Sequence, residues 1–469
     1  MSENDDRVTS GVHLRLLKDI DEPGLAGIDV YERRGGYRAM RKALCELGQD
    51  EVLELIKGSG IKGRGGAGFD MGMKAGFIPK GEMDIILVCN ADESEPGAFK
   101  DRVLMQKNPH MLIEGCIIAA RAVGANLGYI YIRGEYELQG DILDRALAEV
   151  REKGYVGDDI LDSGFDLRLH LHRGSGAYIA GEETGMLSSL EGKRAEPRIK
   201  PPFPANIGGG AFANPTLVNN VETLCNVPFI VEMGPEEFKK VGTEQSSGTK
   251  VVSVSGNVQR PGNYEVALGT PVRDIVYGLA GGPPEGREVK GFFPGGSSSA
   301  FLTGDEGLDL PYSFEGIEEA GSMLGSGSII VVDESQPLVP LALRLAEFYR
   351  HESCGKCVPC REGTNWTVKM LERVDNGEAT PMDLEIMAQV QENIIGNCLC
   401  VLGDSMAEPI GSMIAKFRDE FEQHIEQARA RNEAAIGEPL GAADLALTPE
   451  VGPSGGTDVG PDRPADALH

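Results

Sequence analysis

The stretch DIILVCNADESEPGAFKDR, residues 84–102, decides the fold of the N-terminal half of the chain. It begins with an apolar, β-branched run typical of a buried strand and continues into a polar, acidic segment. Helix and strand patterns then alternate: MLIEGCIIAARAVGANLG (111–128) predicts a helix, YIYIR (129–133) a strand, and residues 139–153 a further helix. This alternation predicts an α/β layer fold.

The rest of the chain is long enough for further domains. It has 469 residues, and a domain usually holds about 150. The polar, glycine-containing segment FKKVGTEQSSGTK (238–250) marks a boundary. Beyond it, VVSVSG, the turn QRPGN, VRDIVYGLAGG and finally SIIVVD (328–333) predict a small α+β unit.

Strand patterns end before Pro337. Apolar residues three and four apart, such as Phe417, Phe421 and Ile425, predict helices over LALRLAEFYRHES, TNWTVKMLERV, MDLEIMAQVQENII and EPIGSMIAKFRDEFEQHIEQA, and hence a small helical bundle. After about Asn432 the chain lacks aromatic residues and is rich in Pro, Gly and Ala, which predicts a disordered acidic tail. The expected division is 1–60 (N-terminal helical extension), 61–240 (α/β domain), 248–334 (α+β domain), 336–431 (helical domain) and 432–469 (tail).

Composition and charge narrow the function classes. We find no uncharged apolar run of roughly 18 residues, so we expect no membrane span. The acidic start MSENDDRVTSGV lacks the pattern of an export signal, which predicts a protein that stays inside the cell. The formal net charge of -28 would repel a phosphate backbone, so nucleic acid is not an expected partner.

Three of the nine cysteines, Cys354, Cys357 and Cys360, fall within HESCGKCVPCREGT (351–364). A reducing cytosol favours a metal or redox site over disulfides. A site with four protein ligands needs one more thiol, and the candidates are Cys398 and Cys400 in NCLCVLGD. The two-residue spacing resembles runs that hold an iron-sulfur cubane, while zinc and inert thiols remain alternatives. The single cysteines are expected to be small buried hydrophobic residues: Cys45, Cys89, Cys116 and Cys225.

Glycines and carboxylates form a first candidate ligand site. GRGGAG (63–68) fits G-x-G-x-x-G but follows a helical pattern rather than a strand, so a tight turn explains it as well as a phosphate cradle does. Asp92, Glu93 and Glu95 follow the strand at its carboxyl end, where open α/β sheets bind ligands. Such carboxylates accept hydrogen bonds from ribose or flavin hydroxyls; the alternative is that they cap the next helix.

A second glycine-rich stretch, HRGSGAYIAGEETGMLSSLEG (172–192), sets Tyr178, Glu182 and Glu183 beside another cradle. Its structural alternative is a helix N-terminus capped by acids. RIKPPFPA (198–205) adds Lys200 and Phe203, or forms only a rigid loop. Taken together, the two cradles, the carboxylates, the lysine and the aromatic residues suit a large planar cofactor pair.

Five segments carry a resemblance to a known family: GRGGAGF, CNADESEPGAFKDR, GAYIAGEETGMLSSLEGKRAEPRIKPPFPA, PTLVNNVETL and ESCGKCVPCREGT. In this order they resemble the NADH-binding flavoprotein subunit of respiratory complex I over roughly residues 35–430. The resemblance implies a Rossmann-like FMN domain, a ubiquitin-like β-grasp (SLBB-like) domain and a C-terminal four-helix bundle with an iron-sulfur cluster.

The resemblance also implies the site residues. FMN would be surrounded by Gly63, Gly65, Gly66, Lys74, Asn90, Asp92, Ser94, Gly181, Glu182, Asn219, Asn220 and Thr223. NADH would contact Phe69, Lys74, Phe77, Glu95, Tyr178, Glu183, Lys200 and Phe203. One 4Fe-4S cluster would be held by Cys354, Cys357, Cys360 and Cys400. Ala75 and the 206–216 segment depart from the family pattern and leave some cofactor contacts open.

The implied activity is NADH dehydrogenase: hydride passes from NADH to FMN, and electrons pass singly to the cluster and on toward quinone, with no catalytic acid or base. The implied partners are a thioredoxin-like 2Fe-2S subunit and a large multi-cluster subunit, on the cytoplasmic side of the membrane and peripheral to it. Two alternatives remain: a diaphorase subunit of a soluble NAD-dependent hydrogenase or formate dehydrogenase, and a non-catalytic iron-sulfur scaffold.

Overall fold

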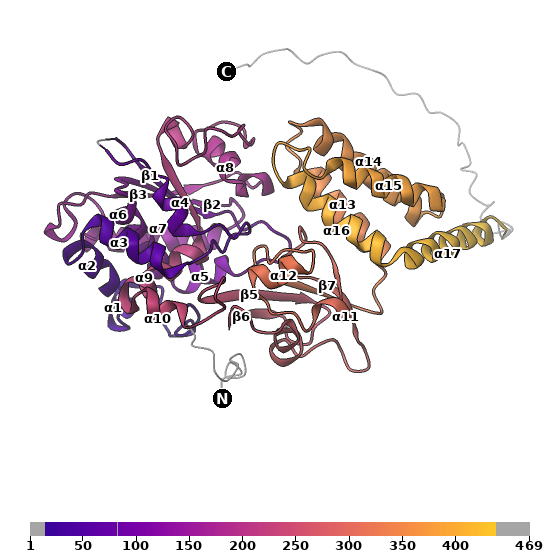
Figure 1. Cartoon of the computed structure of the whole chain (residues 1–469), viewed down its shortest axis with the longest axis horizontal. Coiled ribbons are helices and arrows are strands. Elements are labelled where there is room, and N and C mark those ends of the chain that lie inside the picture. The colour runs from indigo at the N-terminus through magenta and orange to yellow at the C-terminus, as the bar shows by residue number, and fades with distance from the viewer. Residues whose placement is uncertain (1–14, 82, 438–469) are drawn as a thin grey trace, which may run out of the picture.

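The computed structural model describes residues 15–81 and 83–437, and three regions of the chain are distinct in it (Figure 1). The first is built on a parallel four-stranded sheet of order β3-β2-β1-β4. Its strands are β1 (Ile86–Ala91), β2 (Leu127–Ile132), β3 (Arg168–Arg173) and β4 (Thr216–Asn220). The predicted strands and the α/β class are confirmed for this region.

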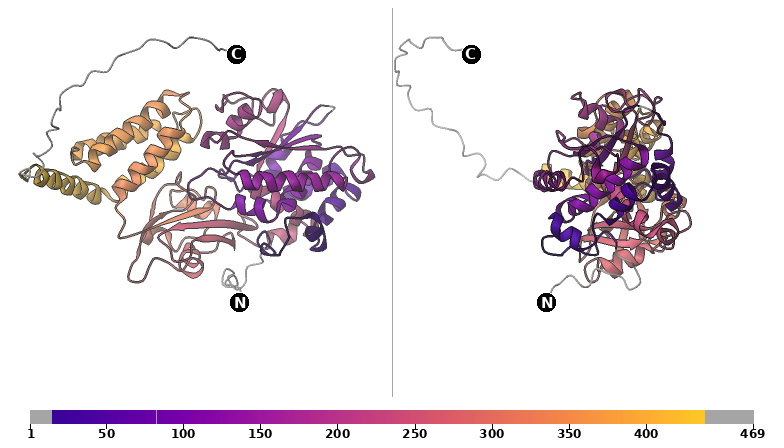
Figure 2. Two further views of the ribbon diagram at one scale, coloured as in Figure 1. Left: turned by 180° about the vertical axis from the view of Figure 1, so that it is seen from behind. Right: turned by 90° about the vertical axis from the view of Figure 1, so that its left-hand side faces the viewer.

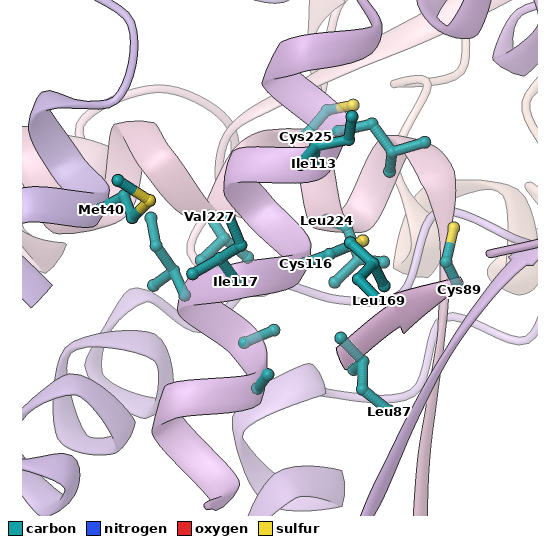
Figure 3. Packing of buried hydrophobic residues seen from close by; sticks show 14 of the residues in the cluster. Met40, Leu87, Cys89, Ile113, Cys116, Ile117, Leu169, Leu224, Cys225 and Val227 are labelled. Carbon is teal, nitrogen blue, oxygen red and sulfur yellow. The ribbon is translucent and has the colours of Figure 1, made fainter. Parts of the chain in front are cut away.

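Helices cover both faces of the sheet, as an all-parallel sheet requires. The helices of this region, of which some pack on the sheet and others on those helices, are α1 (Ile28–Arg33), α2 (Arg38–Cys45), α3 (Gln49–Ser59), α4 (Met71–Gly76), α5 (Asp101–Lys107), α6 (Pro109–Val123), α7 (Glu137–Glu152), α8 (Glu183–Leu190), α9 (Val221–Met233) and α10 (Pro235–Lys239). Leu87 and Cys89 of β1 face α6, whose Ile113 and Cys116 lie opposite them (Figure 3). The alternate side chains of β1 pack instead with α8.

Helix α6 is shorter than its sequence pattern indicates. The pattern predicts a helix over 111–128, but α6 ends at Val123 because Gly124 adopts a left-handed conformation (φ +73°), and β2 begins at Leu127. Within α6, Gly115 allows close approach to α9, since an added Cβ would lie 2.0 Å from the carbonyl oxygen of Leu224.

The second region is a five-stranded mixed sheet of order β6-β5-β9-β7-β8. Its strands are β5 (Thr249–Gly256), β6 (Gly262–Ala267), β7 (Val289–Phe293), β8 (Leu302–Thr303) and β9 (Ser328–Asp333), with a π-helical turn η5 (Asp274–Leu279) and the helices α11 (Gly304–Gly307) and α12 (Phe314–Glu319). The central strands β5 and β9 are parallel, and the other pairs are antiparallel. This arrangement agrees with the predicted α+β unit.

The third region is helical: α13 (Leu338–Glu352), α14 (Val358–Asp375), α15 (Pro381–Ile394), α16 (Leu402–Lys416) and α17 (Arg418–Gly437). Helices α13 and α15 each pack against both α14 and α16. Helix α17 follows α16 and packs against α13, α14 and α16, with Phe421 and Ile425 in the shared core (Figures 1 and 2).

Three sequence-based expectations are wrong. The segment predicted as one C-terminal helix is broken at Phe417, where the backbone turns (φ -127°, ψ 33°) and the ring packs against Phe301 at 5.8 Å between centroids. Helix α17 then continues to Gly437, past the expected start of the tail at Asn432, and residues 438–469 lie outside the described residues. Cys45 is exposed at the end of α2, whereas Cys89, Cys116 and Cys225 are buried as expected.

None of the helices in 15–81 and 83–437 has the length and apolarity to cross a membrane.

Candidate active site

The carboxyl edge of the first sheet brings several predicted site residues together. Strands β1 and β4 are neighbours in register, with Cys89 opposite Asn219 and Asn90 opposite Asn220. The amide of Asn90 donates to the carbonyl of Gly181 at 2.8 Å, so the second glycine stretch lies against the end of β1. A crevice at this edge is where open α/β sheets bind ligands.

The glycine loop between α3 and α4 lies on the same edge. The Arg64 backbone N–H donates to Thr223 Oγ1 at 2.8 Å, which fixes the loop to the start of α9. A Cβ added to Gly65 would lie 2.9 Å from the Cβ of Asn220, whereas one added to Gly66 (φ +145°) would meet nothing within 4 Å. The glycines therefore let the loop backbone lie close to Asn220 at Gly65 and leave open space beside Gly66.

Two buried polar atoms at this edge have no hydrogen-bond partner among the residues that the structure describes: Asp92 Oδ2 and Asn219 Nδ2. The other oxygen of Asp92 accepts from Ser94 Oγ. Burial raises the pKa of Asp92 to about 7, although the Ser94 hydrogen bond opposes the shift. An unpaired acceptor and an unpaired donor beside a glycine cradle fit FMN, whose ribityl hydroxyls donate and whose phosphate and ring carbonyls accept.

Some acidic residues serve the structural role that the sequence left open. Glu93 accepts from the backbone N–H groups of Asp101 at 2.7 Å and Arg102 at 3.0 Å, in the first turn of α5. Glu182 caps α8, accepting from the N–H groups of Thr184 and Gly185, both at 2.8 Å. Both carboxylates therefore stabilise helix N-termini at the rim of the crevice.

Exposed aromatic rings and a lysine–glutamate cluster lie at the mouth of the site. Phe69, Phe77 and Phe203 are 48%, 56% and 51% exposed, and the first two rings are 6.3 Å apart. The Glu183 carboxylate binds Lys74 Nζ at 2.7 Å and Lys200 Nζ at 2.9 Å. Burial would raise the pKa of Glu183, but the two ammonium groups outweigh it and hold that pKa below its ordinary value.

Glu95 is held by residues from the first and second regions and is linked through Ser297 to the third. Its carboxylate accepts from Tyr178 Oη at 2.7 Å, from the Ser298 backbone N–H at 2.8 Å and from Ser297 Oγ at 3.2 Å. Ser297 Oγ also pairs with the hydroxyl of Tyr349 in α13 at 2.8 Å. Burial raises the pKa of Glu95, against the effect of these hydrogen bonds.

Ser297, Ser298 and Tyr349 were missed by the sequence reasoning. The run PGGSSSA (294–300) between two strand patterns was the available signal, since glycine and serine there indicate a loop with many hydrogen-bonding groups. Tyr349 carried no local signal, because its position in an amphipathic helix predicts only a core residue.

The helical region gathers the cysteines. Cys354 and Cys357 lie in the α13–α14 loop, Cys360 in the first turn of α14, and Cys398 and Cys400 between α15 and α16. Burial raises the pKa of Cys360 to about 11, with the Cys357 and Cys354 thiols adding to the shift. Burial likewise raises the pKa of Cys400 to about 12, and the nearby groups that add to it are Glu182, Cys360 and Cys354.

Cys398 also lies near the predicted ligands, with Cys357 and Cys360 among the groups that add to the burial-driven rise of its pKa. Its thiol faces the Ile394 carbonyl oxygen at 3.6 Å. A set of soft thiolate donors fits an iron-sulfur cluster. Among residues 15–81 and 83–437, no three His, Cys, Asp or Glu side chains are grouped around a single metal-ion position.

Direct contacts join the cysteine loop to the crevice. Arg194 Nη2 donates to the carbonyl of Cys354 at 3.0 Å, and Lys356 Nζ donates to the carbonyl of Pro197 at 2.7 Å. The Tyr178 backbone N–H donates to the Glu352 carboxylate at 2.9 Å. The thiols thus lie beside the candidate flavin and nucleotide residues, an arrangement that suits electron transfer between a flavin and an iron-sulfur cluster.

Comparisons with known proteins give the family. The Nuo51 FMN-binding domain matches residues 56–229, the SLBB domain residues 251–300, and the NADH-ubiquinone oxidoreductase-F iron-sulfur binding region residues 340–424. The chain belongs to the family of NADH-quinone oxidoreductase F subunits. It is 50% identical to the NADH-quinone oxidoreductase F 2 subunit of Rhizobium meliloti, covering 88% of this chain and 98% of that one. It is 46% identical to the corresponding F subunit of Escherichia coli, covering 88% and 92%.

A solved structure is similar over nearly the whole chain. It is an NAD+-reducing [NiFe]-hydrogenase in the H2-reduced state, with a TM-score of 0.77, 33% identity, and coverage of 94% of this chain and 74% of that one. The expected NADH dehydrogenase activity and the cofactors FMN, NADH and a 4Fe-4S cluster are confirmed by the family. The chain is one subunit of a multi-subunit enzyme.

Proposed function

We propose that this chain is the electron-entry subunit, which orients NADH over FMN in the sheet-edge crevice and holds the first iron-sulfur acceptor beside it. FMN, when bound, takes two electrons as hydride and releases them one at a time. The observation that carries the proposal is the direct docking of the cysteine loop on the crevice, through Arg194 and the Cys354 carbonyl at 3.0 Å.

The chain's own residues bind the flavin. Gly63, Gly65, Gly66 and Gly181 let the main chain approach it, while Asn219 donates and Asp92 accepts through the atoms that lack partners in the chain. The remaining flavin contacts are assigned to Lys74, Asn90, Ser94, Glu182, Asn220 and Thr223.

NADH enters at the exposed aromatic rings. Phe69, Phe77 and Phe203 offer half-exposed faces for the adenine, a stack of this kind being worth roughly 0.5 to 1.5 kcal/mol. Glu95 and Tyr178 contact NADH from inside the crevice, and Lys74, Glu183 and Lys200 form the rim around the ribose and phosphates. No side chain acts as a general acid or base.

The proposed cluster ligands are Cys354, Cys357, Cys360 and Cys400, because the segment Cys400-Val-Leu-Gly-Asp resembles the family's fourth-ligand segment and Cys398 does not fit it. The finer layout is three domains: residues 61–240 for FMN and NADH, 248–334 as a β-grasp, and 336–431 as a four-helix bundle, preceded by the extension 1–60. The sheet order of the second region and the mutual packing of α13 to α16 support this assignment.

The partners are a thioredoxin-like 2Fe-2S subunit and a large multi-cluster subunit that carry electrons toward quinone, on the cytoplasmic side of the membrane. The likeness to an NAD+-reducing hydrogenase supports a second candidate, a diaphorase subunit of a soluble enzyme. The two candidates share the same site chemistry and differ only in the final acceptor.

The site assignment is tested with purified protein reconstituted with FMN, iron and sulfide. The flavin-loaded chain should reduce ferricyanide with NADH, and Phe203→Ala should raise KM for NADH about tenfold while leaving the FMN content unchanged, because one ring face is lost. Ile207→Ala, which removes another exposed apolar side chain of this region, is the control. A protein that binds FMN but does not oxidise NADH would reject the proposal in favour of a scaffold.

A further inference from the structure

Two adjacent charged residues, Lys100 and Asp101, are buried behind the crevice and have no role in the assignment above. Their side chains are only 1% and 3% exposed, and Lys100 Nζ lies 2.7 Å from Asp101 Oδ1. Lys100 also pairs with the fully buried Glu222 at 2.9 Å. Removing charged groups from water costs free energy that their mutual attraction does not always offset, so this buried ion pair calls for a role beyond stability.

The partner is the side-chain amide of Asn220. Its Nδ2 donates to Asp101 Oδ2 at 2.7 Å. Its Oδ1 accepts from the Glu222 backbone N–H at 3.0 Å and from Lys100 Nζ at 3.4 Å. The carbonyl oxygen of an amide accepts two hydrogen bonds and the NH2 group donates two, so only one N–H of Asn220 remains unused.

The orientation of this amide is fixed by charge. In the flipped orientation, the NH2 group of Asn220 would face the Lys100 ammonium and the Glu222 N–H, and its oxygen would face the Asp101 carboxylate. Every contact would then be repulsive, donor against donor or acceptor against acceptor. Lys100 and Asp101 therefore hold Asn220 as a hydrogen-bond donor toward any ligand.

The surroundings of Asn220 indicate which ligand group takes this bond. The Cβ of Asn220 lies against the glycine loop at Gly65, and Asn220 is the N-cap of the 13-residue helix α9. Next to it, Asn219 is only 7% exposed and has the unpartnered donor Nδ2. A corner that offers donors at a helix N-terminus suits a phosphate, which only accepts at neutral pH.

We propose that Lys100 and Asp101 are positioning residues for the flavin site, and that they favour FMN over riboflavin by holding Asn220 as a donor to the phosphate. This role rests on the proposed function, because it assumes that FMN occupies the crevice.

The test is a fluorescence titration of the apoprotein with FMN and, separately, with riboflavin. The variants are Lys100→Met, which removes the ammonium, and Asp101→Asn, which keeps the size of the side chain but places a donor against either Lys100 or Asn220. Lys240→Met is the control, since Lys240 is exposed and pairs with the neighbouring Glu237 on α10.

Wild type and Lys240→Met should bind FMN much more tightly than riboflavin. Both test variants should lose at least about tenfold of this preference, chiefly through weaker FMN binding, because the amide of Asn220 is free to turn. If circular dichroism shows that Lys100→Met does not fold, the FMN and riboflavin affinities of Asp101→Asn decide the test. A loss of both affinities by the same factor indicates a merely structural role and overturns the proposal, as does an unchanged preference.

The titration also separates this inference from the function itself. Wild-type protein that does not bind FMN would overturn the flavin assignment and with it the positioning role. Wild-type protein that prefers FMN, together with folded variants that keep the same preference, would overturn the positioning role alone.

Discussion

At the residue scale, Glu183 controls the charge at the mouth of the nucleotide site. Its carboxylate binds Lys74 and Lys200 at 2.7 and 2.9 Å, which keeps it ionised. Together with Glu95 it presents negative charge that would repel the 2′-phosphate of NADPH. Glu183→Ala removes this charge and takes the carboxylate away from Lys74, whose ammonium group would then attract a phosphate, while Lys200 keeps its pair with Glu182 at 3.2 Å.

We therefore expect Glu183→Ala to raise the ratio of kcat/KM for NADPH to that for NADH by about tenfold or more, measured as ferricyanide reduction. Glu54→Ala, which breaks a surface pair with Lys57, is the matched control and should leave the ratio as it is. An unchanged ratio in Glu183→Ala would remove Glu183 from the specificity determinants.

The sequence predicts the roles of some of these residues and not of others. The cysteine spacing places Cys354, Cys357 and Cys360 together because two-residue spacers keep them within one local turn. The acids Glu93 and Glu182 take the capping role that their positions before helices allowed. Lys100 gave no local signal, since its partner Glu222 lies far along the chain and only the fold brings them together.

At the element scale, the loop between β7 and β8 brings the second sheet into the active site. Ser297 Oγ joins Glu95 to Tyr349 of α13, with contacts of 3.2 and 2.8 Å. Ser297→Ala should raise KM for NADH several-fold, because a buried hydrogen bond to a charged group contributes about 1.5 to 3 kcal/mol, while FMN affinity stays constant.

Ser326→Ala is the control for that prediction. Its hydroxyl contacts the same loop, through the Gly295 carbonyl at 3.3 Å, but does not touch Glu95. Steady-state NADH kinetics and a flavin titration check both variants. Equal KM values for the two variants would show that Ser297 does not position Glu95.

Element types follow from local pattern more reliably than element ends. The four-residue spacing of Phe417, Phe421 and Ile425 continues through the break between α16 and α17, so the spacing cannot reveal it. The turn occurs where Phe417 packs on Phe301, a residue from another region. The end of α6 could have been predicted from the sequence, because a glycine such as Gly124 commonly ends a helix.

At the scale of the whole molecule, the function depends on how the three regions meet. Contacts such as Arg194 with Cys354 and Tyr178 with Glu352 join residues 160 and 174 positions apart, so no sequence window contains them. The sequence predicted the regions and their order, since each has its own hydrophobic period. The docking of the cysteine loop on the crevice appears only in the folded chain.

The central claim is that electrons pass within this one chain from FMN to a cluster held by Cys354, Cys357, Cys360 and Cys400. The most direct measurement is an anaerobic NADH titration of the reconstituted protein, with flavin absorbance and low-temperature EPR recorded together, on wild type, Cys400→Ser and Cys398→Ser.

We expect NADH to bleach the flavin in all three proteins. We also expect a reduced-cubane EPR signal in wild type and Cys398→Ser, and the loss of that signal in Cys400→Ser. A flavin that never bleaches with NADH, or a cubane signal retained in Cys400→Ser and lost in Cys398→Ser, would contradict it.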